Sequence, residues 1–161
     1  MIMKGVLSRW ILRGVLKSAL AFETEALSTY TKLRQRLGTG RSCSDDLDAS
    51  LCHLIEEEDS HRRILMDAAE GKLSLEELQA MLDRHLYEGF DRIRPLTGET
   101  LREWEADLSA ALEQEEKTWI FYGNLRRMSK IPTVKKAFEA LASMEKEHLD
   151  ILRRLLDRSE R

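Results

Sequence analysis

The sequence predicts an all-α protein: an antiparallel four-helix bundle with a short extra helix between the second and third long helices. Apolar residues recur at helical spacing along four long segments, and no alternating pattern of a credible strand interrupts them. Glycine and proline, which break helices, are rare, with 8 and 2 among 161 residues. At this length we expect one domain spanning residues 1–161.

The first two long helices are separated by a glycine-containing turn. The first is predicted to run to about Leu37 and to stop at residues 38–40, which read Gly-Thr-Gly. The second begins with Asp45 and Asp46 in its first turn, where negative charge suits the positive end of the helix dipole. Gly71 ends it. These two helices therefore form a hairpin with a short loop.

A connection of about 30 residues, 71–99, leads to the second half of the chain. Within it a short helix is predicted from Ser74 to about Phe90, opened by a capping box between Ser74 and Glu77. A connection of this length can run the whole length of a bundle, so the two hairpins need not follow a simple up-down order. The short helix is expected either to cover one end of the bundle or to form an interface.

The third and fourth long helices form a second hairpin. The third is predicted to start near Thr100, with Glu103 completing another capping box. Pro132 opens the fourth, since proline is well suited to the first turn of a helix.

Charged residues interrupt each apolar stripe where a core residue is expected. Every long helix has one glutamate at such a position, and the second and fourth helices add a histidine three residues later. Residues three apart lie on the same face of a helix. The six residues are Glu23, Glu58, His61, Glu115, Glu145 and His148.

Four carboxylates facing a bundle interior require compensation, because burying a charge is costly and like charges repel. Two divalent cations would balance four carboxylates, with two neutral imidazoles completing the ligand set. One glutamate from each of two helices, plus Glu-x-x-His from each of the other two, is the pattern of dinuclear carboxylate centres in helix bundles. A single Glu-x-x-His usually lies on a solvated helix face, but the joint pattern favours metal. The two glutamate pairs also have similar separations, 35 and 30 residues.

The sequence resembles the rubrerythrin branch of the ferritin-like superfamily. The resemblance is carried by ETEALSTY (23–30), EEDSH (57–61), EEKTWIFY (115–122) and EKEH (145–148), and it covers most of the chain outside residues 71–99. It implies a ferritin-like bundle in which Glu58 and Glu145 bridge two metals. Each metal would also bind one terminal glutamate and one histidine, drawn from Glu23, Glu115, His61 and His148.

The resemblance also places two tyrosines beside the centre. Tyr30 and Tyr122 each follow a terminal glutamate by seven residues. A supporting role at the metals and ordinary packing of core aromatics are both compatible with that spacing.

One departure from the family pattern concerns the third long helix. Rubrerythrins carry an additional glutamate one turn from the terminal ligand, whereas here Leu112 and Thr118 flank Glu115 at that distance. Glu113 and Glu116 are close in sequence but belong to a different helix face. We therefore expect a six-ligand centre, closer to that of bacterioferritin.

These patterns predict a non-haem di-iron oxidoreductase that reduces peroxide or dioxygen through two iron ions, with manganese or zinc as alternative metals. Full-length rubrerythrins add a four-cysteine iron domain that delivers electrons; this sequence has only two cysteines, so an external electron donor is expected. Two alternatives stay open at this point. One is iron handling as a ferroxidase or storage protein, and the other is a structural metal site in an interaction module.

Composition limits the partners. The net charge is −3 and no basic block is present, which argues against nucleic acid. The apolar stretch 6–22 contains three basic residues and is too polar to span a membrane, so a cytoplasmic protein is expected. We also expect a homo-oligomer, with a dimer favoured. The basic segment 4–17 is expected to dock on the bundle or a second subunit, with membrane-surface contact as the alternative.

Simpler roles are expected for the remaining candidates. These are surface positions for His53 and His85, free thiols for Cys43 and Cys52, and packing for Trp10, Trp104 and Trp119.

Overall fold

The computed structural model describes residues 2–38, 45–82 and 93–157, and within them it has five helices and no strand. The long helices are α1 (Ile2–Leu37), α2 (Asp45–Ala69), α4 (Gly98–Met128) and α5 (Pro132–Leu155). A short helix, α3 (Leu75–Leu82), stands between α2 and α4. The predicted all-α bundle with an additional short helix is confirmed.

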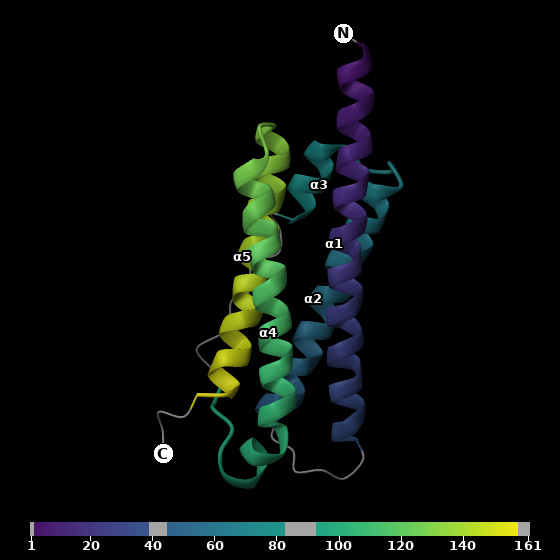
Figure 1. Ribbon diagram of the computed structural model, residues 1–161. Helices are drawn as coiled ribbons and strands as arrows, with labels where there is room; N and C mark the ends of the chain where they lie inside the picture. Colours follow the sequence, from purple (N-terminus) through teal and green to yellow (C-terminus); the bar gives the residue numbers. More distant parts are fainter. Residues whose placement is uncertain (1, 39–44, 83–92, 158–161) are drawn as a thin grey trace.

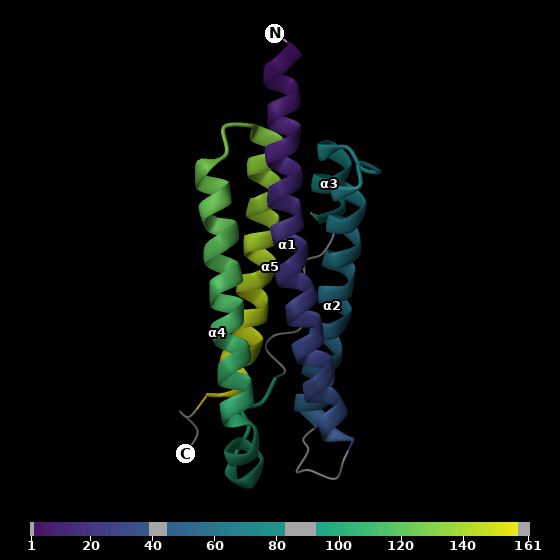
Figure 2. The same ribbon diagram turned by 45° about the vertical axis from the view of Figure 1, so that its right-hand side comes forward.

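The four long helices form two antiparallel hairpins, α1–α2 and α4–α5, lying side by side (Figures 1 and 2). In both views α2 and α4 run in the same direction, while α1 and α5 run in the opposite one. The order is therefore not simple up-down, because α3 lies at one end of the bundle and α4 begins at the other. The first turns of α1 extend beyond the ends of the other long helices.

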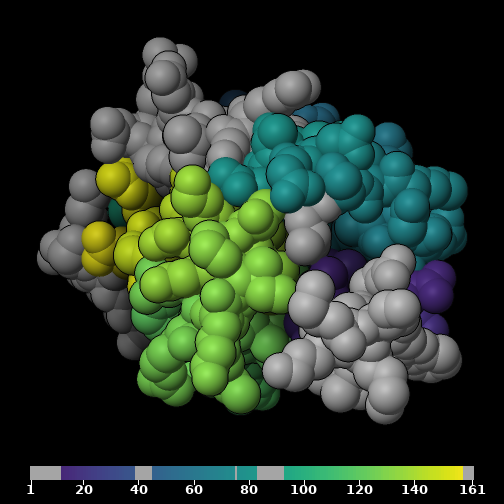
Figure 3. Space-filling model, turned by 90° about the horizontal axis from the view of Figure 1, so that it is seen from above, coloured from purple at the N-terminus to yellow at the C-terminus, as the bar shows by residue number. Residues whose placement is uncertain are grey.

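Helix α3 covers the end of the bundle at which α2 finishes. Gly71 turns the chain there with φ of 78°, which glycine adopts without strain. The predicted capping box is present: the Ser74 N–H donates to Glu77 at 2.8 Å, and the Glu77 N–H donates to the Ser74 hydroxyl at 3.1 Å. Helix α3 packs on α2 and α5, and Figure 3 shows its surface beside the tips of α4 and α5. The predicted extension towards Phe90 lies outside the described residues.

The start of α4 differs slightly from the prediction. The helix begins at Gly98 with Thr97 as its N-cap, and the Thr97 side chain makes no capping hydrogen bond, so Thr100 lies within the helix rather than at its N-cap. The chain is fixed earlier because Leu96 is 3 % exposed and its N–H donates to the Leu155 carbonyl at 2.9 Å. The helix consequently starts about half a turn before the position that the capping pattern indicated.

The core consists of two apolar clusters, one towards each end of the bundle. The first, here called the lower cluster, contains Leu47, Leu51, Trp104, Leu108 and Leu152 among its buried residues. The second, the upper cluster, contains Leu16, Leu65, Leu78, Phe138 and Leu141. In each long helix the predicted glutamate stands in sequence between residues of the two clusters. The acidic residues therefore form a polar layer across the middle of the bundle.

Candidate metal centre

All six residues predicted as metal ligands lie inside the bundle. Their exposure is 0–2 % of the maximum, which is as low as that of the leucines around them. Each of the four long helices contributes one glutamate, and α2 and α5 each add their histidine one turn further along. None of the six therefore belongs to a solvated helix face, the arrangement that would have removed the case for metal.

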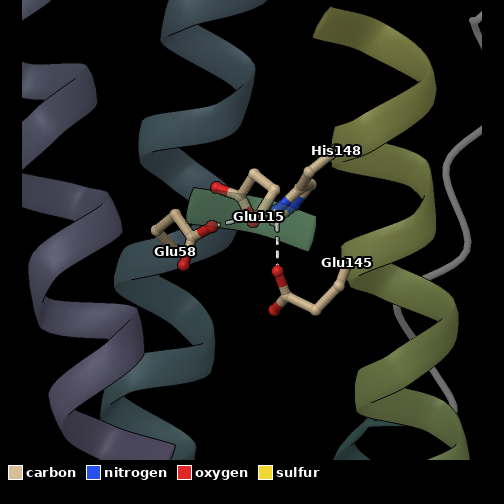
Figure 4. Close-up of side chains that lie close together, drawn as sticks. All are labelled: Glu58, Glu115, Glu145 and His148. Atoms are coloured by element: carbon tan, nitrogen blue, oxygen red, sulfur yellow. Dashed lines mark ion pairs between the residues drawn. The ribbon is translucent and has the colours of Figure 1, made fainter. Parts of the chain in front are cut away.

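The ligand atoms fall into two groups whose members lie within 4.8 Å of one another. Glu58, Glu115, Glu145 and His148 form one group, and Glu23, Glu58 and His61 form the other. Figure 4 shows the first group, with side chains from α2, α4 and α5 pointing towards one another. Glu58 belongs to both groups, which is the position a bridging ligand needs. By the same distance Glu145 belongs only to the first group.

Both histidines turn the same ring nitrogen towards the carboxylates. Nδ1 of His148 lies 2.9 Å from Glu58 Oε1 and 3.8 Å from oxygens of Glu115 and Glu145. Nδ1 of His61 lies 3.3 Å from Glu23 Oε2. The two imidazole rings are stacked, with centroids 5.7 Å apart and planes inclined by 18°. The two Glu-x-x-His turns therefore face each other across the polar layer.

Two tyrosines each form a hydrogen bond with a glutamate of the other hairpin. The Tyr30 hydroxyl on α1 donates to Glu115 on α4, and the Tyr122 hydroxyl on α4 donates to Glu23 on α1. Both rings are fully buried. Burial and the neighbouring carboxylates raise the pKa of both phenols well above the usual value, so both hydroxyls stay protonated and can donate.

Two of the four carboxyl groups are held in the charged form. Burial alone would raise the pKa of Glu115, but its neighbours, His148 first and then Glu145 and Tyr30, together outweigh burial and lower the pKa to about 2. The neighbours of Glu23, His61 first and then Glu58 and Tyr122, likewise outweigh burial together and lower its pKa. Burial would lower the pKa of both histidines, but Glu23 together with Glu57 and Glu58 raises that of His61 to about 9, and the neighbouring carboxylates, Glu115 first, raise that of His148.

The other two carboxyl groups hold protons. Burial raises the pKa of Glu58 and Glu145 well above the usual value, and the charges of Glu23 and Glu115 raise it further. The metal-free centre thus pairs two carboxylates with two imidazolium groups and keeps the remaining two carboxyls neutral. Its net charge is zero, which is the condition for burying so many titratable groups.

The chemistry of the donor set fits a pair of divalent cations. Both oxygens of Glu58 and of Glu145, one oxygen of Glu23 and one of Glu115 are buried without a hydrogen-bond partner. Buried polar atoms normally have partners, so six orphaned carboxylate oxygens converging on one volume indicate a site for cations. Carboxylate oxygen and imidazole nitrogen together suit iron, manganese or zinc.

Comparison with known protein families supports this interpretation. The family model for rubrerythrin matches residues 107–161, which include most of α4 and all of α5. Over this C-terminal third the chain is similar to rubrerythrin. The matched segment carries Glu115, Glu145 and His148, while Glu23, Glu58 and His61 come from the unmatched hairpin. Searches of curated proteins and of solved structures found no significant match.

The candidate centre has no seventh carboxylate on the described residues of α4. Thr118 is 2 % exposed and its hydroxyl donates to the Gln114 carbonyl at 3.2 Å, while Leu112 is partly buried against the lower cluster. Glu113 forms an exposed ion pair with Lys117 at 2.9 Å. Glu116 pairs with Arg153 of α5 at 2.9 Å. Both acidic neighbours therefore point away from the centre.

Sequence reasoning missed one acidic residue near the centre. Glu57, directly before Glu58, places Oε2 3.6 Å from Nε2 of His61, and its side chain is 22 % exposed. The sequence signals it only by the run of three glutamates at 56–58, which does not distinguish a second inward carboxylate from a solvated one.

The other candidates have simpler surroundings. Trp104 is fully buried in the lower cluster, whereas Trp119 is 40 % exposed, so the packing role predicted for both holds only for Trp104. His53 is about half-buried rather than a surface residue, and burial lowers its pKa. Cys52 is a free, partly buried thiol. The predictions for Cys43, His85 and the side chain of Trp10 lie outside the described residues.

Among the described helices none is long and apolar enough to cross a membrane.

Proposed function

We propose that this chain is a non-haem di-iron oxidoreductase of the rubrerythrin type that reduces peroxide or dioxygen. The observation that carries the proposal is the buried layer of four glutamates and two histidines, contributed by all four long helices. No other arrangement of the described side chains brings so many metal-ligating atoms together away from water.

In this proposal Glu23 and His61 would hold one iron and Glu115 and His148 the other, with Glu58 and Glu145 as ligands shared by both. A ferrous pair at such a centre supplies two electrons to one oxidant molecule, which avoids release of a radical product. The protein contributes an anionic ligand set that favours the ferric state. The two apolar clusters on either side of the layer limit the access of bulk water.

The tyrosines position the terminal ligands. Each hydroxyl donates to one oxygen of Glu23 or Glu115, leaving the second oxygen of that carboxylate for a metal. Because the donor belongs to the opposite hairpin, each terminal carboxylate is oriented by the packing of α1 against α4. The rings themselves remain part of the apolar clusters.

Anaerobic single-turnover mixing tests the proposal. Full-length protein loaded with Fe²⁺ is mixed with hydrogen peroxide or with dioxygen, and oxidation of the iron pair is followed by absorption and Mössbauer spectroscopy. We expect rapid oxidation by one or both oxidants, and a loss of this reaction in Glu145→Ala. Glu113→Ala is the matched control, because Glu113 lies on the same bundle but is exposed. Iron-loaded wild type that reacts with neither oxidant would reject the oxidoreductase.

The absence of a seventh carboxylate among the described residues of α4 favours a second candidate, a ferroxidase or iron-storage centre. Thr118 and Leu112 occupy the positions one turn from Glu115. A storage protein needs a closed shell of many subunits, while the proposed reductase is expected to be a cytoplasmic dimer served by an external electron donor. Mass measurement in solution separates the two: a cage of about two dozen chains would favour storage, and a dimer would favour the reductase.

A structural zinc site is the third candidate, and metal content decides it. Zinc has no redox chemistry, so zinc in protein isolated from its native source would remove the proposed reaction. Two irons for each chain in that sample would support it.

A further inference from the structure

The two hairpins build the centre from equivalent positions. In each hairpin the first helix carries a glutamate that is followed seven residues later by a tyrosine. These pairs are Glu23 with Tyr30 in α1 and Glu115 with Tyr122 in α4. Each second helix carries Glu-x-x-His, at 58–61 and at 145–148. On these six residues and two tyrosines alone, the two halves of the centre would be nearly alike.

The residue directly before each Glu-x-x-His breaks this likeness. In α2 it is Glu57, whose carboxylate lies 3.6 Å from Nε2 of His61. In α5 it is Met144, which is 2 % exposed and belongs to the upper apolar cluster. One histidine therefore has an acidic group at its second ring nitrogen, and the equivalent position on the other hairpin is apolar.

The ring nitrogens of His61 have different surroundings, and this decides what Glu57 can do. Nδ1 lies on the side of the proposed ligands, 3.3 Å from Glu23, while Nε2 is directed to Glu57. A histidine that binds a metal through one nitrogen needs its other N–H fixed by an acceptor, which sets the tautomer and ring orientation and makes the ligand more basic. Glu57 is placed to be that acceptor.

His148 differs in the part of the chain that the structure describes. All its ion pairs there are made by Nδ1, with Glu58, Glu115 and Glu145, and no described carboxylate pairs with Nε2. Its ring is fixed by packing instead: it is 2 % exposed and is stacked on His61.

We propose that Glu57 is a positioning residue for His61 and makes the two metal sites unequal, so that the site containing His61 binds a divalent cation more tightly and fills first. This inference rests on the proposed di-metal centre and deepens it. Sequential filling would give the centre a defined half-loaded state, with the cation held by Glu23, Glu58 and His61.

Titration of the metal-free full-length chain with Co²⁺ tests the inference, with calorimetry and visible absorption as readouts. Wild type is expected to bind two Co²⁺ in two resolved steps. Glu57→Met copies the residue found before Glu145 and is expected to weaken the tighter step by about 10- to 100-fold, leaving the weaker step unchanged. Glu57→Gln keeps an acceptor oxygen and is expected to recover part of the loss. Glu56→Met, at an exposed neighbouring position, is the matched control.

A double-mutant cycle assigns the affected step to a histidine. In a His61→Ala background Glu57→Met should cause no further loss of Co²⁺ affinity. In a His148→Ala background it should weaken binding as much as it does in the wild type. The Co²⁺ absorption spectrum of the tighter site should change in Glu57→Met and be largely restored in Glu57→Gln.

The outcomes separate this inference from the proposed function. Wild type that binds two Co²⁺ with affinities unaffected by Glu57→Met, or equally reduced at both steps, overturns the role of Glu57 and leaves the di-metal centre standing. Wild type that binds fewer than two Co²⁺ overturns the centre itself, and the role of Glu57 with it.

Discussion

Tyr30 on α1 donates a hydrogen bond to Glu115 on α4, across the boundary between the two hairpins. The reciprocal bond, from Tyr122 to Glu23, crosses the same boundary in the opposite sense. Each terminal glutamate is thus held by a tyrosine from the other hairpin and not by the one that follows it in sequence. The polar layer therefore joins the halves of the bundle as well as offering ligands.

Removing one of these hydroxyls is expected to cost stability without disturbing the packing. Tyr30→Phe keeps the ring in the lower cluster and leaves an oxygen of Glu115 without its donor. A hydrogen bond to a charged group contributes about 1.5–3 kcal/mol, so we expect a loss of that order in the free energy of unfolding of the metal-free protein. Urea denaturation measures it. Thr24→Val is the control, because it removes only an exposed hydroxyl that bonds within its own helix; a loss no larger than that of the control would contradict the prediction.

Replacing Glu58 by leucine should separate metal binding from stability. In the metal-free protein this carboxyl is neutral and fully buried; neither oxygen makes a hydrogen bond, although Nδ1 of His148 lies 2.9 Å from Oε1. Its loss should leave the unfolding free energy unchanged or raise it by about 1 kcal/mol, since apolar replacements of buried polar groups are often tolerated. Paired metal binding should disappear, as measured by metal analysis after equilibration with Fe²⁺ or Co²⁺. Retention of two metals per chain would show that Glu58 is not a ligand; Glu56→Leu serves as the exposed control.

Metal loading should release protons. At mildly acidic pH the metal-free centre holds them on Glu58, Glu145, His61 and His148, because each of these groups has a raised pKa. Binding two divalent ions requires deprotonated ligands, so we expect release of about four protons and an affinity that rises steeply with pH. Calorimetry in buffers of different ionisation enthalpy counts the protons. Release of one proton or none would contradict the charge distribution described here.

The metal-free protein should be most stable in mildly acidic solution. The raised pKa of His61, about 9, contributes stability that is complete below the unfolded value of 6.5 and is lost as pH rises through 9. Glu58 also has a raised pKa, so its contribution likewise falls as pH rises above the unfolded value of 4.5. Glu115, with a pKa of about 2, contributes fully only above 4.5 and loses this as pH falls towards 2.

The maximum is therefore expected near about pH 5, with a decline towards about pH 9. Urea midpoints measured in the presence of a chelator test this, and the metal-loaded protein should show the opposite trend because its ligands must be deprotonated. A metal-free protein that gains stability as the solution changes from mildly acidic to mildly basic would contradict the assignment of protons.

Most of the helical framework follows from sequence, because each element is specified locally. Apolar spacing locates the long helices, and the reciprocal bonds of Ser74 and Glu77 can be anticipated from their separation alone. The start of α4 cannot, because it depends on the contact between Leu96 and Leu155, which are distant in the chain. The buried Leu96 fixes the backbone about one turn before Thr100, and this contact, rather than the capping pattern at Thr100, decides where the helix starts.

The candidate site shows the same division. The burial of Glu23 and its equivalents was predictable, since they interrupt helical stripes at regular positions. Which tyrosine contacts which glutamate was not, because the pairing depends on how one hairpin lies against the other. The position of Glu57 beside His61 escaped prediction for a different reason: a side chain at the edge of a stripe can turn inward or outward with little change in spacing.

Helices α1 and α2 contact each other along much of their length, as do α4 and α5, whereas contacts across the hairpin boundary are sparser. The molecule in this respect consists of two closely packed hairpins, and α3 contacts both of them. Chains cut between α3 and α4 should consequently behave as complementary fragments. Divalent cations should strengthen their reassociation, because the ligands come from both fragments, so that the ions would assist assembly of the fold as well as react within it.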